Sequence, residues 1–184
     1  MKKMILLPAF VAILLLAGCG KDPQSYLDEA KKLVEAKKYK DAIKVYESMI
    51  AEMPESDSLA VAYFSLGGLY NMPEVAQTSK DKMTAVEYYK KVHEKFPKSE
   101  YAPMALFYAG FIYGNELGDI AKATENYNLL IKEYPEHPAA KLAKDDLALL
   151  GKTPEELLNE ALKKNEQGGE KKDGEKKKEE FVHP

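Results

Sequence analysis

The sequence predicts an all-α solenoid of helix-turn-helix repeats. Three stretches share one spacing: Ala, then Tyr four residues later, an apolar residue three further on, and Pro five beyond that. The closing prolines, at positions 54, 97 and 135, stand 43 and 38 residues apart, a period typical of stacked helical repeats. No strand-like alternation of any length appears. The matching triplets are Ala42, Tyr46 and Met49; Ala85, Tyr89 and Val92; and Ala123, Tyr127 and Leu130.

Residues 1–18 are predicted to be a lipoprotein signal peptide. Two lysines precede an apolar run, Met4 to Ala17. As a helix this run is about 21 Å long, too short to cross a hydrocarbon core of roughly 30 Å. Its end, Leu16-Ala17-Gly18-Cys19, resembles a bacterial lipobox, in which cleavage precedes the cysteine and the cysteine is lipidated. The alternative is an ordinary signal peptide followed by an unrelated cysteine.

Lipidation at Cys19 would anchor the chain to a membrane. Residues 19–23 comprise the lipidated cysteine and a short linker. The linker spans at most roughly 15 Å, which keeps the following domain near the membrane surface. Gly20 after the cysteine resembles the default for the outer membrane, so we expect the periplasmic face of the outer membrane. The inner membrane and the extracytoplasmic cell surface are the alternatives.

The repeat domain is predicted over residues 24–165, followed by a disordered tail rich in Lys and Glu at 166–184. Within the second repeat, six residues more than usual lie in the stretch 72–80 and predict a long turn. Gly151 should end the capping helix, and Thr153 with Glu156 should form a capping box for a further helix. The predicted units are repeats at about 24–54, 58–97 and 101–135, a cap at 138–150 and an extra helix at 154–165.

The repeats resemble the tetratricopeptide repeat (TPR), a unit of two helices whose first helix carries a Leu-Gly pair and a Tyr. Leu66-Gly67 with Tyr70 and Ala109-Gly110 with Tyr113 stand at these positions. Glycine in a helix costs up to about 1 kcal/mol relative to Ala, so we expect close helix packing at Gly67 and Gly110. The resemblance implies a right-handed solenoid with three repeats, a capping helix and a further C-terminal helix.

A narrower resemblance covers roughly residues 24–150. The loop at 96–105 is similar to that of periplasmic TPR lipoproteins of outer-membrane protein assembly and of the TPR coordinator of the Tol–Pal system. This implies a lipid-anchored scaffold that binds partner proteins during envelope assembly, with an adaptor for the Tol–Pal or cell-wall machinery as the alternative. The assembly lipoproteins have about five repeats, however, and this chain has three.

The first helices of TPR units line a concave face, which is the predicted protein-binding groove. It should be apolar with aromatic anchors, a surface suited to an amphipathic helix or an extended apolar peptide. Two alternatives remain: the phenylalanines could be core, and the helix after Pro154 could fold back over them. The predicted groove residues are Leu27, Lys31, Val61, Phe64, Asn71, Met104, Phe107 and Phe111.

Composition and motifs argue against catalysis and against nucleic-acid binding. The chain has 27 basic and 30 acidic residues, a net charge of −3, and no arginine, which disfavours nucleic-acid binding. His93, His137 and His183 lie far apart, and no phosphate loop, metal-ligand spacing or nucleophile elbow is present. We therefore expect no catalytic residue, no metal, no cofactor and no small-molecule substrate. A lipoprotein enzyme remains as the least favoured alternative.

Overall fold

The computed structural model describes residues 21–160 together with 162 and 163. The predicted signal peptide, Cys19 and the tail at 166–184 therefore lie outside the described residues. Within the described part the chain is helical and contains no strand. The elements are α1 (Pro23–Glu35), α2 (Tyr39–Glu52), α3 (Leu59–Asn71), α4 (Ser79–Lys95), α5 (Tyr101–Phe111), a π-helical turn η1 (Ile112–Glu116), α6 (Ile120–Glu133) and α7 (Pro138–Leu149).

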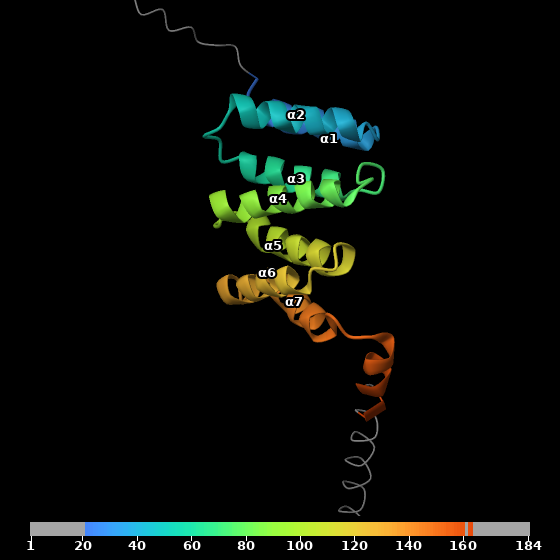
Figure 1. The fold of residues 1–184 in the computed structure, drawn as a ribbon. Helices are drawn as coiled ribbons and strands as arrows, with labels where there is room; N and C mark the ends of the chain where they lie inside the picture. Colours follow the sequence, from blue (N-terminus) through green and yellow to red (C-terminus); the bar gives the residue numbers. More distant parts are fainter. Residues whose placement is uncertain (1–20, 161, 164–184) are drawn as a thin grey trace, which may run out of the picture.

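The helices form three antiparallel pairs that stack along one axis, as Figure 1 shows. The pairs are α1 with α2, α3 with α4, and α5 with α6, and α7 packs on the last pair. A further helical segment at 154–160 projects beyond α7. This arrangement confirms the predicted all-α solenoid of three repeats, a cap and an additional helix. No helix of the described part is long and apolar enough to span a membrane.

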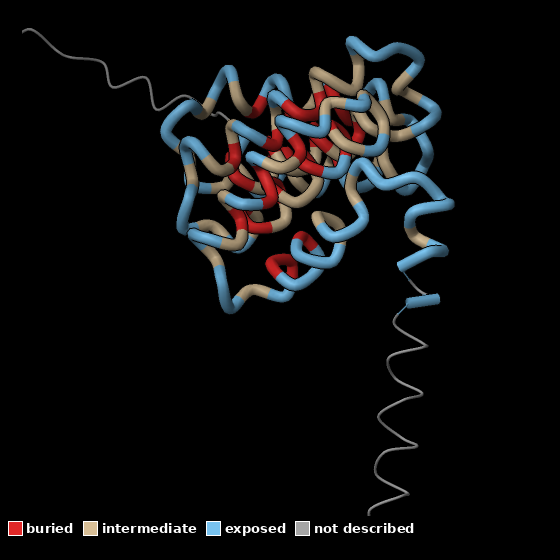
Figure 2. Tube along the Cα trace, turned by 60° about the horizontal axis from the view of Figure 1, so that its bottom comes forward, coloured by how far each residue is buried: buried red, intermediate tan, exposed pale blue. Residues whose placement is uncertain are grey.

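The repeated triplets form the core between the stacked pairs. Figure 2 shows that the buried positions concentrate inside the stack, while the loops are exposed. The Ala of each triplet has no exposed surface, and each Tyr is at most 6% exposed. Since these residues recur at the same place in every second helix, one spacing in the sequence contributes to both core clusters of the solenoid. The buried triplets are the repeated ones of the sequence: Ala42, Tyr46, Met49; Ala85, Tyr89, Val92; and Ala123, Tyr127, Leu130.

Two glycines allow the paired helices to approach closely. A Cβ atom at Gly67 would lie 2.7 Å from the Tyr89 ring, and one at Gly110 would lie 2.6 Å from the Tyr127 ring. Real Cβ atoms essentially never approach other heavy atoms so closely, so only glycine fits without a shift. The predicted packing role of both glycines is confirmed.

The helix boundaries follow local signals in the sequence. Thr78 begins α4 with a complete capping box, in which its hydroxyl accepts from Asp81 N–H and the Asp81 carboxylate accepts from Thr78 N–H. The long turn predicted near 72–80 is present between α3 and α4. The Gln77 side chain donates to the Pro73 carbonyl at 3.0 Å, so the turn is held by its own hydrogen bonds.

The end of the solenoid also follows the predicted signals. Gly151 has a φ of +76° directly after α7, a conformation that favours glycine. Glu156 N–H donates to the Thr153 hydroxyl, and Thr153 N–H donates to the Glu156 carboxylate at 2.7 Å. The predicted capping box is therefore formed at the start of the projecting helical segment.

The first helix of repeat three, which begins at Tyr101, is not a uniform α-helix. The α-helix ends at Phe111 and continues as the π-helical turn η1. Gly114 lies in this turn against the end of α7, where a Cβ atom would stand 2.7 Å from Leu150 Cδ1. The turn also brings Glu116 to the side of α3 and α4. Contacts with three other helices therefore accompany the change of helical form, and the local sequence carries no signal for it.

Candidate protein-binding groove

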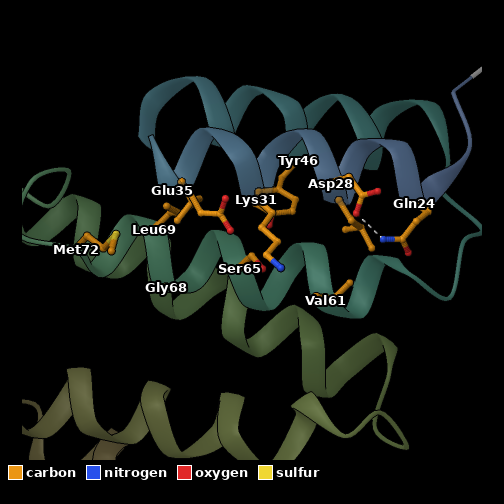
Figure 3. Close-up of a pocket in the computed structure, with 12 residues that line it drawn as sticks. Gln24, Asp28, Lys31, Glu35, Tyr46, Val61, Ser65, Gly68, Leu69 and Met72 are labelled. Carbon is orange, nitrogen blue, oxygen red and sulfur yellow. Dashed lines mark hydrogen bonds between the residues drawn. The ribbon is translucent and has the colours of Figure 1, made fainter. Parts of the chain in front are cut away.

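An open groove of about 660 Å³ lies between the first helices of repeats one and two. Figure 3 shows side chains from α1 and α3 facing each other across it, with Tyr46 of α2 behind. The α1 residues recur every three or four positions, so they share one face of that helix. The lining residues are Gln24, Leu27, Asp28, Lys31, Val34 and Glu35 of α1; Tyr46 of α2; Val61, Ser65, Gly68 and Leu69 of α3; and Met72, which follows α3.

The groove has an apolar interior and a charged rim on α1. Its apolar members are half-buried or buried, which leaves part of their surface available to a partner. The rim residues Asp28, Lys31 and Glu35 are exposed and carry both signs of charge. Gln24 donates to the Asp28 carboxylate at 2.8 Å and closes one end of the rim. The apolar interior residues are Leu27, Val34, Tyr46, Val61, Leu69 and Met72.

The groove is open because small residues occupy the α3 side. Ser65 and Gly68 face α1, and a Cβ atom at Gly68 would meet nothing closer than the Tyr89 hydroxyl at 3.7 Å. Helix α1 makes few contacts with α3, whereas α3 packs against α5 and α5 against α7. The space between α1 and α3 therefore stays open. A second hollow of about 600 Å³ lies further along the solenoid, between the start of α3 and the loop that leads into α5.

A tyrosine pair on α3 and α4 holds repeat one in place behind the groove. The Tyr70 and Tyr88 rings stack with centroids 5.6 Å apart. Both hydroxyls donate to Glu47 of α2, at 3.2 Å and 3.4 Å. Burial, and then the negative Glu47, raises the pKa of Tyr88 to about 12. Repeat one is thus attached to repeat two through α2, which leaves α1 free to form the far wall of the groove.

Of the predicted groove residues, Leu27, Lys31 and Val61 line this groove. Phe64 lies on another side of α3, where its ring packs 5.5 Å from Tyr89 and 5.2 Å from Tyr101. Phe64 therefore packs between α3 and α5. The equivalent position between α1 and α3 stays open.

The remaining predicted residues divide between the core and a second surface. Phe107 stacks near Tyr127, with ring centroids 5.8 Å apart, and Met104 packs on the same cluster. Phe111 is 37% exposed at the far end of α5. Phe64 and Phe107 are half-buried and both contact the Tyr108 ring, whereas Phe111 is exposed. The described residues of the helical segment after Pro154 lie beyond α7 rather than over α5 (Figure 1).

Asn71 belongs to a polar cluster that joins α3, α4 and η1. Its Nδ2 donates to Glu116 Oε1 at 3.2 Å, and Glu116 also forms an ion pair with Lys82. The Asn71 Oδ1 atom is buried without a hydrogen-bond partner among the described residues. The neighbouring Tyr89 is mostly buried, and this burial raises its pKa. The cluster fixes η1 against repeat two rather than lining the groove.

Several groove residues were missed from the sequence. Asp28 and Glu35 extend the predicted α1 face, and the spacing of Gln24, Leu27, Lys31 and Val34 could have identified them. Tyr46 belongs to the first repeated triplet and is buried, yet it also lines the groove. Its contact with the groove depends on the separation of α1 from α3, which no local pattern encodes.

The groove is lined mainly by apolar side chains, with a few charged groups at its rim. No group of three or more His, Cys, Asp or Glu residues in the described part could hold a metal ion. His93 lies 2.7 Å from the Glu133 carboxylate and links α4 to α6 away from the groove. The groove itself presents an apolar interior, one amine and two carboxylates.

Fold and groove together define a solenoid of helix-turn-helix repeats with an open concave surface. A family model of the tetratricopeptide repeat matches residues 58–99 and 104–137. These two segments cover the pair α3–α4 and most of the pair α5–α6, so these two helix pairs are similar to tetratricopeptide repeats. The pair α1–α2 lies before the matched residues and carries the same buried triplet. No curated protein matches the chain significantly.

Proposed function

We propose that this protein is a scaffold that binds an apolar segment of a partner protein in the groove between α1 and α3. The observation that carries the proposal is the unfilled apolar space between two first helices of a TPR solenoid. Tetratricopeptide repeats typically serve as protein-interaction surfaces, and a concave, mainly apolar site with a few polar groups suits a ligand of this kind.

An amphipathic helix is the partner segment that fits best. Helix α3 is 13 residues long, so the groove can accompany a partner helix for about 20 Å, or three to four turns. Apolar side chains at every third or fourth position of the partner would face Leu27, Val61 and Met72. The mixed charges of Asp28, Lys31 and Glu35 favour a flanking sequence with both signs over a uniformly charged one.

We further propose that the protein is anchored by lipid on Cys19, at the periplasmic face of the outer membrane, and serves envelope assembly. Two features support this: the lipobox-like sequence that ends at Cys19, and the resemblance of the loop at 96–105 to that of assembly lipoproteins. Helix α1 begins at Pro23, four residues after Cys19, so the groove would lie close to the membrane. The partner would then be a membrane-proximal envelope protein. The same features suit an adaptor of the Tol–Pal or cell-wall machinery, so the experiment must separate the two.

Copurification of the full-length protein from crosslinked membranes provides the test. Ser65→Trp would fill the groove, since Ser65 faces it from α3, and should reduce partner recovery at least tenfold. Glu87→Trp, on the exposed side of α4, is the matched control and should leave recovery unchanged. Barrel-assembly components in the wild-type sample would support outer-membrane protein assembly. Pal, Tol proteins or wall synthases would support the adaptor role. Equal recovery by both variants would show that the groove is not the binding site.

A further inference from the structure

The exposed large hydrophobic residues of the described part gather at the C-terminal end of the solenoid. All of them lie between positions 111 and 162, and the first two helix pairs contribute none. A solenoid end that faces water normally carries a polar outer surface. These exposed residues are Phe111, Ile120, Leu142, Leu149, Leu158 and Leu162.

Helix α7 is apolar on two sides. Ala139, Ala140 and Ala143 are buried against the preceding pair. Leu142 and Leu149 lie seven residues apart, which places them on one face two turns apart. They are 46% and 55% exposed. The cap therefore covers the last repeat but leaves an apolar face of its own uncovered.

A hollow of about 240 Å³ adjoins this face, where η1, the start of α6 and the end of α7 meet. Phe111, Ile120, Leu149 and Leu150 provide its apolar side chains, and Asn115, Asp146 and Lys152 provide polar and charged groups. The hollow thus has room for an aliphatic side chain from outside, with polar groups at its edge.

The projecting helical segment carries matching side chains. Leu158 and Leu162 lie one turn apart and are 59% and 51% exposed. A short isolated helix is marginally stable in water, so this stripe requires a surface to pack against. Its orientation is held by the Thr153–Glu156 capping box and by Lys152, whose amine binds the Glu160 carboxylate at 2.8 Å. In this orientation the segment projects beyond α7 (Figure 1), and Leu158 and Leu162 do not line the hollow of their own chain, although Lys152 does.

We propose that two copies of this chain pair through their C-terminal ends, each inserting Leu158 and Leu162 into the hollow of the other. One chain carries both the inserted stripe and the receiving hollow, so a two-fold exchange covers both surfaces in each copy. Charge is compatible with this pairing. Lys141 and Lys144 flank Leu142 without an ion pair in the described part, and Glu155 beside the stripe is exposed. The groove between α1 and α3 lies at the opposite end and stays accessible.

Cysteine crosslinking in membranes tests the exchange with the full-length chain. Two differently tagged copies, one Leu158→Cys and the other Ile120→Cys, are coexpressed and oxidised. We expect a disulfide-linked species that carries both tags. Leu158→Cys with Glu125→Cys is the matched control, because Glu125 is exposed on α6 away from the hollow, and it should give at least tenfold less of that species.

A chain with both substitutions distinguishes exchange from folding back. A disulfide formed only within single chains would overturn the proposal and would show that the segment covers its own hollow. Absence of any Leu158–Ile120 disulfide would overturn it as well. In sedimentation of the purified protein, Leu158→Asp with Leu162→Asp should raise the dimer dissociation constant at least tenfold with unchanged circular dichroism. A wild-type chain that sediments as a monomer at all accessible concentrations would contradict pairing.

Discussion

Gly67 and Gly68 are neighbours in α3 but serve opposite purposes. Gly67 faces the Tyr89 ring and lets α4 approach, whereas Gly68 faces the groove and leaves it open. The first is required by packing inside a repeat. The second is permitted by the absence of a neighbour between repeats. At the residue scale, the distinction between core and groove therefore depends on which side of one helix a small residue occupies.

The two glycines predict different stability effects of one substitution. Gly67→Ala should lower the free energy of unfolding by about 1–3 kcal/mol, because its Cβ would overlap the Tyr89 ring. Gly68→Ala should leave it unchanged or raise it by up to about 1 kcal/mol, since alanine favours the helix and the Cβ has room. Urea unfolding followed by circular dichroism measures both. Equal losses at the two positions would contradict the described packing.

Glu47 predicts a measurable change in tyrosine ionisation. Glu47→Gln should lower the pKa of Tyr88 from about 12, because it removes a negative charge beside the phenol, although burial will still hold the pKa above 10. Since the folded-state pKa exceeds the ordinary value near 10, the neutral phenol stabilises the fold below about pH 10. That contribution is lost as the pH rises through about 12.

Tyrosinate absorbance during alkaline titration provides the measurement. Glu55→Gln is the control, because Glu55 is an exposed residue of the loop before α3. An unchanged titration in Glu47→Gln, or the same change in both variants, would rule out the proposed contact.

The repeated triplets can be recognised from the sequence, whereas the surroundings of the groove residues depend on tertiary packing. The triplets are local, since each lies within one helix and recurs, so burial could be inferred from spacing alone. Phe64, Phe107 and Phe111 look alike in their helices, yet one closes an interface, one joins the core and one is exposed. Their environments depend on how closely successive first helices approach, which is a tertiary property.

At the scale of elements, caps and turns were predictable because their chemistry is local. Short sequence motifs account for the capping boxes at Thr78 and Thr153, for the long turn after α3 and for the glycine at position 151 that follows the end of α7. The π-helical turn η1 was not predictable in the same way. Its contacts are to Leu150, Asn71 and Lys82, which are distant in the sequence.

The capping box of α4 should contribute measurably to stability. Thr78→Ala removes the hydroxyl that accepts from Asp81 N–H and should cost about 1 kcal/mol. Ser79→Ala is the control, because Ser79 is the first exposed residue of the same helix, and should have little effect. Chemical denaturation of both variants decides the matter, and a Thr78→Ala protein as stable as wild type would show that the cap is unimportant.

At the scale of the whole molecule, the two ends of the solenoid differ. The N-terminal end carries the open groove, and the C-terminal end carries the exposed apolar residues. Helices α1 and α3 make few contacts, and this opens the groove. It could not be predicted from the sequence, because the repeat motifs do not determine the distance between successive units. The lipid anchor proposed on Cys19 would place the groove at the membrane and the pairing surface further away.

The anchor predicts how the chain fractionates. Cys19→Ser removes the only thiol in the sequence and should shift the protein from the membrane fraction to the soluble periplasmic fraction, because lipid attachment is lost. Immunoblotting of separated fractions measures the shift, with Ser25→Ala as the control. Retention of Cys19→Ser in washed membranes would show that lipid on this residue is not what holds the protein there.

The central claim is that the space between α1 and α3 receives a partner segment, and photo-crosslinking from inside the groove tests it most directly. A photoreactive amino acid at Val61 of the full-length protein in native membranes should give a discrete adduct. Mass spectrometry should locate it in an amphipathic helical segment of an envelope protein. The adduct should disappear with Ser65→Trp, and the same photoreactive residue at Glu87 should give none. No adduct from Val61, or one unaffected by Ser65→Trp, would contradict binding in the groove.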